Sequence, residues 1–414
     1  MKTPNRLYRS LYGEAQDKES NNRRITDLYS RYRSIFRSEC TSLFSAAGRT
    51  ELGGNHTDHN NGKVLAGAIN LDTLAAVALR NDSTVCIDSE GYGELTVDLS
   101  DLSVREDERN TSASIIRGIA ASFALRGLRT GGFNAAITST VMPGSGLSSS
   151  ASIEVLIAEI FNSLFNDDLL DPIQLAIIGK EAENRYFGKP CGLLDQMACA
   201  YGGIIGMDFS SEIPDITPID IRFEDHGLNL VIVNTGGSHA DLTDEYASIP
   251  REMKEVAAFF GKSVLREVKH DRFMASIREL RKRLGNDRAI LRAMHFFDEN
   301  LRVEGMIDAL KQRDMEMYLA LVADSGSSSF RFLQNVYPSS SPTFQSLSLA
   351  LALSEEILSG EGACRVHGGG FAGTIQAYVP IDMLPEYIRG MEAVFGEGST
   401  TVLSIRKKRV IRLI

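Results

Sequence analysis

Hydrophobic and polar residues follow two different periods along the first half of this chain. Three runs between residues 63 and 100 alternate with a period near two, as β-strands do: KVLAGAINLDTLAAVALR, STVCIDS and GELTVDLS. Apolar residues recur at helical spacing in residues 24–37, 112–125 and 150–164. Residues 1–20 are mostly polar, and we expect them to form a loose, charged segment ahead of the first helix.

A strongly apolar strand, LNLVIVNTG, opens the second half, and helical patterns dominate after it. The helical segments are REMKEVAAFFG, FMASIRELRKRLG, AILRAMHFFDENLRVEGMIDALKQ and MEMYLALVADS. Glycine-rich VHGGGFAGTIQAYVP leads into a further strand, and we expect TVLSIRKKRVIRLI to close the chain as another. The pattern changes near residues 210–227, and a chain of 414 residues is long for one ordinary core. We therefore predict an α+β protein with two domains, residues 1–215 and 216–414.

Composition narrows the class of protein and of partner. Hydrophobic residues make up 43% of the chain and charged residues 24%, the balance of a soluble globular protein. The formal net charge of −10 argues against nucleic acid as the main partner, and no apolar run is long enough to span a membrane. Five scattered cysteines show no Cys-x-x-Cys or zinc spacing, which favours free thiols in a reducing compartment. With a polar N-terminus that lacks a signal peptide, we expect a cytoplasmic protein.

A glycine- and serine-rich loop precedes the helix at residues 150–164. It contains Gly144, Ser145, Gly146, Leu147, Ser148, Ser149 and Ser150. Glycines allow backbone N–H groups to turn inward at positive φ, and a helix N-terminus adds partial positive charge, so the loop can hold a triphosphate. The serine hydroxyls can ligate magnesium, which prefers oxygen. A Walker A sequence is absent, and an ordinary serine-rich helix cap is the alternative interpretation.

Two further segments carry candidate chemistry. The run from Arg49 to Leu65 contains Asn55, His56, Thr57 and Asp58, a density of polar groups that suits a sugar with several hydroxyls; a solvated hairpin turn is the alternative.

Downstream, a helix beginning at Asp171-Pro172 should carry Glu183 near its end, and Asp195 follows twelve residues later. On the alternative interpretation, Glu183 is a solvated helix glutamate and Asp195 a helix cap.

Taken in order, these segments resemble the GHMP kinases, named for galactokinase, homoserine kinase, mevalonate kinase and phosphomevalonate kinase. The loop at 144–150 is similar to the family's GxGLSSSA phosphate loop, and residues 48–65 resemble the galactokinase signature GRxNLIGEHxDYxxGxVL. Four positions depart from that signature: Glu51, Gly53, Asn55 and His59 stand where it has Asn, Ile, Glu and Tyr. The segments AEN…GxxDQ, MHFFDENLRV and HGGGFAG are similar to later family motifs, with His367 replacing a smaller residue and Ala372 a glycine.

This resemblance implies a fold and a set of roles. The fold would be the two-domain GHMP kinase fold, with an N-terminal domain like ribosomal protein S5 domain 2 and a ferredoxin-like C-terminal domain. ATP would lie on residues 144–150, and Mg²⁺ between Ser150, Glu183 and the phosphates. Asp195 and Arg49 would be catalytic. The sugar would meet Tyr246 together with Asn55, His56, Thr57 and Asp58.

The implied activity is transfer of phosphate from ATP to the anomeric hydroxyl of galactose. In galactokinases the residue at the position of Asn55 is a glutamate that hydrogen-bonds the outer hydroxyls of the sugar, toward C6. Its replacement leaves galacturonate or another modified galactose as an alternative substrate, because a C6 carboxylate would no longer meet that glutamate. A galactose-responsive sensor without catalysis is a second alternative, and a mevalonate- or homoserine-type kinase a third.

Overall fold

The structure, a computed structural model, describes residues 5–13, 18–142, 144–236 and 242–414. Its larger sheet, in the described part of the chain, has eight strands in the order β12-β1-β2-β5-β3-β4, with β6 and β7 continuing from β2. The strands are β1 (Ser42–Gly53), β2 (Lys63–Leu79), β3 (Thr84–Ser89), β4 (Gly93–Asp98), β5 (Phe133–Ser139), β6 (Ile204–Asp208), β7 (Asp215–Ile219) and β12 (Ile411–Arg412). Because β2 is long, one part of it pairs with β5 and the other with β6.

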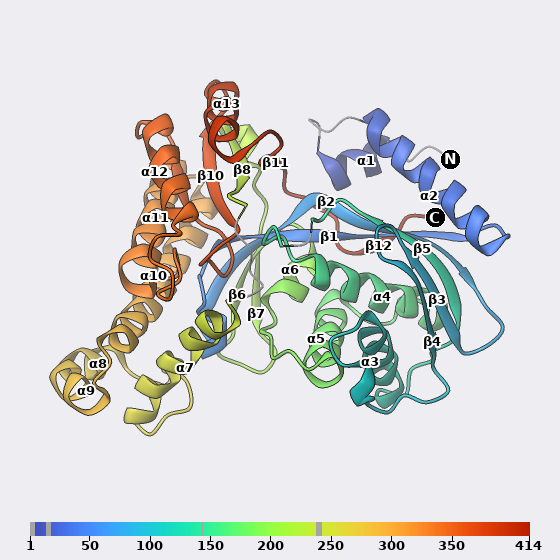
Figure 1. The fold of residues 1–414 in the computed structure, drawn as a ribbon, viewed down its shortest axis with the longest axis horizontal. Helices are drawn as coiled ribbons and strands as arrows, with labels where there is room; N and C mark the ends of the chain where they lie inside the picture. The colour runs from blue at the N-terminus through green and yellow to red at the C-terminus, as the bar shows by residue number, and fades with distance from the viewer. Residues whose placement is uncertain (1–4, 14–17, 143, 237–241) are drawn as a thin grey trace.

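Helices cover both faces of this sheet (Figure 1). On one face lie α3 (Ser112–Leu125), α4 (Ser149–Asn166), α5 (Pro172–Ala182) and α6 (Leu194–Tyr201), and on the other α1 (Asn5–Tyr12) and α2 (Lys18–Phe36). Strand β2 serves both cores because its side chains alternate: Ala75 and Val77 pack toward α3–α6, and Leu74 and Ala76 toward α2.

The expectation of a loose N-terminal segment is wrong for residues 5–12. They form helix α1, whose Tyr8, Leu11 and Tyr12 are buried. Two aromatic rings and a leucine on one side of a short helix supply enough apolar surface to hold it against the sheet.

The smaller sheet has the order β11-β8-β10-β9 and is antiparallel throughout. Its strands are β8 (Leu228–Asn234), β9 (Ala363–Val366), β10 (Thr374–Pro380) and β11 (Thr400–Leu403). Strand β8 again alternates between two cores. Leu230 and Ile232 face the core shared with α10 (Asp287–Gln312) and α11 (Met315–Ser328), and Val231 and Val233 the core shared with α12 (Ser346–Leu358) and α13 (Leu384–Phe395). The remaining α-helices of the described residues are α7 (Thr243–Phe259), α8 (His270–Ala275) and α9 (Ile277–Leu284).

The α+β class is confirmed, and one strand prediction needs correction. The last fourteen residues do not form one strand: residues 401–403 belong to β11 in the smaller sheet, and β12 pairs with β1 in the larger one. The domain division at 215/216 stays a prediction. Strand β7 begins at Asp215 and pairs with β6, so the larger sheet continues past residue 215. Strand β12, near the C-terminus, also belongs to this sheet.

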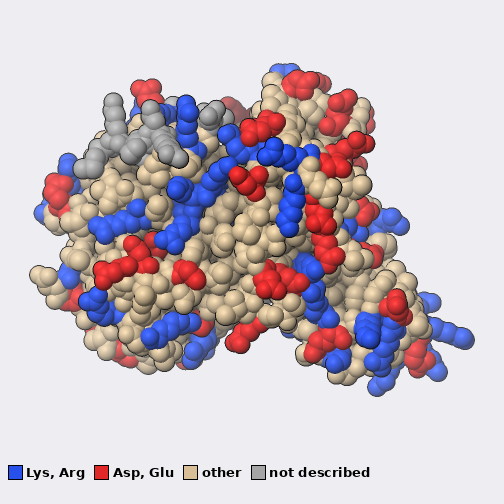
Figure 2. All heavy atoms as spheres, turned by 180° about the vertical axis from the view of Figure 1, so that it is seen from behind, with Lys and Arg blue, Asp and Glu red and all other residues tan. Residues whose placement is uncertain are grey.

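The surface in Figure 2 carries both signs of charge, with acidic side chains beside basic ones over the same face. Among the described helices, none combines the length and the apolar character needed to cross a lipid bilayer. All five cysteines lie in the described part of the chain, and none forms a disulfide.

Candidate active site

Three separate segments meet at the carboxylate of Asp195. Arg49, on β1, reaches Oδ1 of Asp195 with Nε and Nη2, each at 2.8 Å. Its Nη1 also donates to the carbonyl of Gly146 in the glycine-serine loop. Ser148 donates its hydroxyl to Oδ2 of Asp195 at 2.7 Å. The signature segment at residues 48–65, the glycine-serine loop at residues 144–150 and helix α6 are therefore joined by direct hydrogen bonds.

The electrostatics of this junction keep Asp195 ionised. Burial raises the pKa of Asp195, but the Arg49 guanidinium and the hydrogen bonds from Arg49 and Ser148 lower it more, so that its pKa lies below the ordinary value. Asp195 also lies in the first turn of α6, where the helix dipole favours negative charge. The Asp195 side chain is 40% exposed, so a ligand can reach its carboxylate, whereas the Arg49 side chain that holds it is only 8% exposed.

The glycine-serine loop has the backbone geometry expected of an anion site. Gly144, Gly146 and Ser148 have φ values of 74°, 69° and 61°, and α4 begins at Ser149. The loop is fixed from β1, because the Arg49 N–H donates to the Leu147 carbonyl at 3.0 Å. Ser150 is exposed in the first turn of α4. The backbone N–H groups of a first helical turn have no partner within the helix, so they can bind phosphate oxygens.

A pair of buried carboxylates lies beside this loop. Glu183 follows α5 and opens a π-helical turn, Glu183–Phe187. Its Oε1 accepts from Lys189 at 3.1 Å and its Oε2 from Gln196 at 2.9 Å. The same Gln196 amide group donates to Glu154, one turn along α4 from Ser150, also at 2.9 Å. Burial, followed by the charge of Glu183, raises the pKa of Glu154 to about 8.

Sequence reasoning missed Glu154, which the apolar run IEVLIAEIF conceals. A carboxylate inside an apolar helical stretch was the available signal, since buried acids are rare without a partner. In the described part of the chain, no three His, Cys, Asp or Glu side chains gather in a metal-binding arrangement. That Ser150 and Glu183 hold magnesium stays a prediction.

The polar turn after β1 comes against the glycine-rich turn before β10. His56 adopts φ 60°, and its Nε2 lies 2.9 Å from the carbonyl of Gly369. The Tyr246 hydroxyl, from α7, donates to the next carbonyl, Gly370, at 2.8 Å. Burial, together with the neighbouring His59, lowers the pKa of His56 to about 4, so this imidazole is neutral near pH 7. His56 and Tyr246 are thus brought together from distant parts of the chain.

Comparison with known proteins identifies the family. The profile described as "GHMP kinases N terminal domain" matches residues 114–203, and "Galactokinase galactose-binding signature" matches residues 30–79. A galactokinase from Actinobacillus pleuropneumoniae is 33% identical over 366 residues, which span 86% of this chain and 90% of the relative. The chain belongs to the galactokinase family.

Solved structures agree on the fold of this galactokinase-family protein. The crystal structure of Lactococcus lactis galactokinase complexed with galactose matches with a TM-score of 0.79 at 23% identity, covering 94% of this chain and 99% of that one. Methanococcus jannaschii mevalonate kinase matches with a TM-score of 0.63 at 14% identity, covering 90% and 100%. The two-domain GHMP kinase fold is confirmed, and the protein is a phosphotransferase that acts on an alcohol group.

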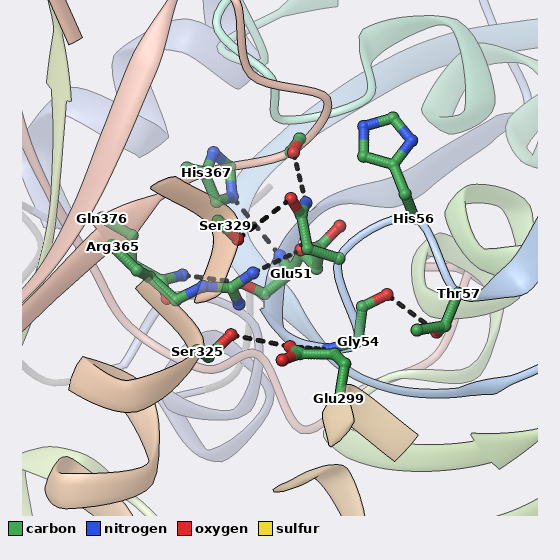
Figure 3. Close-up of polar contacts among 12 residues, drawn as sticks. Glu51, Gly54, His56, Thr57, Glu299, Ser325, Ser329, Arg365, His367 and Gln376 are labelled. Atoms are coloured by element: carbon green, nitrogen blue, oxygen red, sulfur yellow. Dashed lines mark hydrogen bonds and ion pairs between the residues drawn. The ribbon is translucent and has the colours of Figure 1, made fainter. Parts of the chain in front are cut away.

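Two of the residues predicted to meet the sugar lie inside the protein. Thr57 is fully buried, and its hydroxyl donates within the turn: the Lys63 carbonyl lies 2.6 Å from its Oγ1 and the Gly54 carbonyl 2.9 Å from it. Asn55 is also fully buried. It donates to Glu51, which Figure 3 shows beside Arg365 and Gln376. Asp58 and His56 are more open, and contact of any of the four with a sugar stays a prediction.

Asn55 uses its whole amide within the protein. Its Nδ2 donates to Glu51 Oε1 at 2.9 Å and to the Gly368 carbonyl at 2.6 Å. Its Oδ1 accepts from Asn335 at 2.7 Å, with the Ser329 hydroxyl at 3.5 Å. In this structure the amide therefore has no unused donor to offer a ligand.

Side chains of helix α10 hold the backbone of the same turn by hydrogen bonds, a role that sequence reasoning missed. The Gly54 N–H donates to Glu299 at 3.0 Å, and the Lys63 N–H to Asn300 at 2.6 Å. His295 Nε2 lies 2.9 Å from the Asn55 carbonyl. The MHFFDENLRV segment of α10 thus supports the turn that carries Asn55 and His56.

Proposed function

We propose that this protein transfers the γ-phosphoryl group of ATP to the anomeric hydroxyl of galactose and forms galactose 1-phosphate. The observation that carries the proposal is the junction of Arg49, Ser148 and Asp195. It joins the galactose-binding signature to the phosphate loop by hydrogen bonds at 2.7 and 2.8 Å. A sugar hydroxyl at Asp195 and a triphosphate on the loop would then lie next to each other.

Asp195 would act mainly by positioning. A carboxylate whose pKa is lowered is a weak base, so it would hold the O1 hydroxyl by accepting its hydrogen bond and take the proton late in the transfer. The moving phosphoryl group passes through a loose transition state with charge spread over its oxygens. Arg49, buried and fixed by Asp195 and Gly146, would face that charge without having to reorganise.

We propose that nucleotide binds at residues 144–150 and that Mg²⁺ is held by Ser150 and Glu183. A carboxylate and a hydroxyl fit this ion, because magnesium prefers hard oxygen ligands. Bound there, it would neutralise phosphate charge during the transfer. Lys189 and Gln196 orient the Glu183 carboxylate, and Glu183 itself is only 4% exposed. We further propose that the protein works in the cytoplasm, where its five free thiols would stay reduced.

On the sugar side, we propose that His56, Asp58 and Tyr246 contact the substrate, while Asn55 and Thr57 support the turn. Galactose is favoured over galacturonate. Asn55 removes a negative charge from its own position, yet Glu51 places a carboxylate oxygen 2.9 Å from the Asn55 amide. A carboxylate is therefore kept close to this position, on residue 51 instead of residue 55.

The test is direct assay of the purified protein with ATP, Mg²⁺ and a panel of galactose, galacturonate, N-acetylgalactosamine and glucose. We expect galactose to have the highest kcat/KM and the product to be galactose 1-phosphate. Binding of galactose and ATP without any product would support the sensor instead. A higher kcat/KM for galacturonate would overturn the choice of sugar.

A further inference from the structure

Two departures from the galactokinase signature are reciprocal. The signature has Asn where this chain has Glu51, and Glu where it has Asn55. In the structure the two side chains touch, with Asn55 Nδ2 donating to Glu51 Oε1 at 2.9 Å. The chain thus keeps one carboxylate and one amide at these two positions but exchanges their places.

The surroundings of Asn55 exclude a carboxylate at that position while Glu51 is present. Both contacts of its Nδ2, Glu51 Oε1 and the Gly368 carbonyl, are hydrogen-bond acceptors. An ionised aspartate or glutamate has acceptors only, so both hydrogen bonds would be replaced by repulsion between oxygens. The site is fully buried, and water cannot relieve that repulsion.

The surroundings of Glu51 require a carboxylate. Arg365, from β9, is fully buried and donates Nη2 to Glu51 Oε1 at 2.8 Å. Within the described residues, Arg365 Nε and Nη1 have no hydrogen-bond partner, so this guanidinium depends strongly on its acidic neighbour. A buried charge whose partner is removed is strongly destabilised.

The pair lies directly before the turn that carries the sugar-side residues. Asn55 precedes His56 in sequence, and its carbonyl is also held by His295. A shift of Asn55 would therefore move His56 and the residues after it. A shift of about 1 Å at a binding residue is enough to lower activity strongly.

We propose that Glu51 and Asn55 are a coupled pair of positioning residues, exchanged together relative to the signature, that with Arg365 fixes the sugar-binding turn. The part of this inference that concerns sugar binding rests on the proposed function. Neither side chain needs to touch the substrate. Each is tolerated because of the other, and the conformation of His56–Asp58 depends on both.

The test is a cycle of variants that exchanges charge without changing size: Glu51→Gln, Asn55→Asp and the double variant. At pH 8 Asn55→Asp should raise the KM for galactose at least about tenfold, which corresponds to about 1.4 kcal/mol. The double variant should have a lower KM than Asn55→Asp alone, because the amide introduced at position 51 can donate to the carboxylate introduced at position 55. The KM for ATP should change by less than about threefold, since the phosphate loop has separate supports.

A matched control is Asn60→Asp, a buried asparagine in the same turn whose amide neighbours are Met253 Sδ and the Leu265 N–H. Combined with Glu51→Gln, it should give additive effects. Additive effects of the Glu51 and Asn55 substitutions on both KM and the unfolding midpoint would overturn the coupled pair. Coupling in the midpoint with no change in KM would overturn its positioning role.

The unfolding measurement needs no substrate, so it separates this inference from the proposed function. A coupled midpoint in a protein that makes no galactose 1-phosphate would contradict the function and leave the exchange supported. Should Asn55→Asp fail to fold, a folded double variant would support the pair, and failure of both would contradict it.

Discussion

Glu159 should make the stability of this protein depend on pH in a direction unusual for a carboxylate. It lies in α4, the helix that begins at the phosphate loop, and is 2% exposed. Asn162 approaches its Oε2 at a long 3.4 Å. Burial raises the pKa of Glu159 to about 7, from an ordinary value of 4.5.

The sign follows from linkage. Below pH 4.5 the carboxyl is protonated in the folded and the unfolded protein alike, so it has no pH-dependent effect. Between pH 4.5 and 7 the unfolded chain releases the proton first, and the folded state loses stability as the pH rises. Above pH 7 the loss is complete, and a difference of about 2.5 pKa units at 1.36 kcal/mol each makes it about 3 kcal/mol.

The perturbation is Glu159→Gln, which keeps the size and removes the charge. Relative to wild type, the variant should gain about 3 kcal/mol more at pH 8.5 than at pH 4.5, a rise in Tm of several degrees. The assay is thermal or urea unfolding of both proteins at the two pH values. An equal difference in stability at the two pH values would contradict this prediction, because it would mean that folding does not raise the pKa of Glu159.

Two further predictions concern the site. Glu183→Gln should raise the Mg²⁺ concentration needed for activity more than it raises the KM for galactose; the control Glu181→Gln, whose carboxylate pairs with Arg126 near the surface, should change neither. Ser148→Ala should shift the acid limb of the pH–rate profile to higher pH, because the Ser148 hydrogen bond lowers the pKa of Asp195. The control Ser145→Ala loses only a side-chain hydrogen bond to the Met142 carbonyl and should leave the acid limb in place.

Much of the fold could be predicted because its signals are local. Helix α3 has the predicted bounds, and β2, β3 and β4 occupy the predicted alternating runs. Side chains that alternate between two cores leave a clear period of two in the sequence. The sequence of a terminal segment does not show in the same way which strand it will pair with. Residues 401–414 look like one strand, yet they divide between two sheets because each half finds a different neighbouring strand.

The site divides in the same way. The resemblance to the family implied that Arg49 and Asp195 are both catalytic, and the structure joins them directly. The resemblance also placed Asn55 among the sugar-binding residues, and a polar residue in a polar turn gives no sign that it is buried. Its burial depends on Asn335, Gly368 and Glu51, two of which lie about 300 positions away in sequence. Glu154 was hidden for a similar reason, since only the fold places it beside Glu183 and Gln196.

We propose above that Asp195 directs phosphoryl transfer to O1 of galactose. The most direct test of this proposal is ³¹P NMR of the reaction of ATP, Mg²⁺ and galactose, run with wild type and with Asp195→Asn. We expect a sugar 1-phosphate signal from wild type and at least about 100-fold slower formation by the variant, with nucleotide binding kept. Formation of galactose 1-phosphate by Asp195→Asn at nearly the wild-type rate, or its absence with wild type, would contradict it.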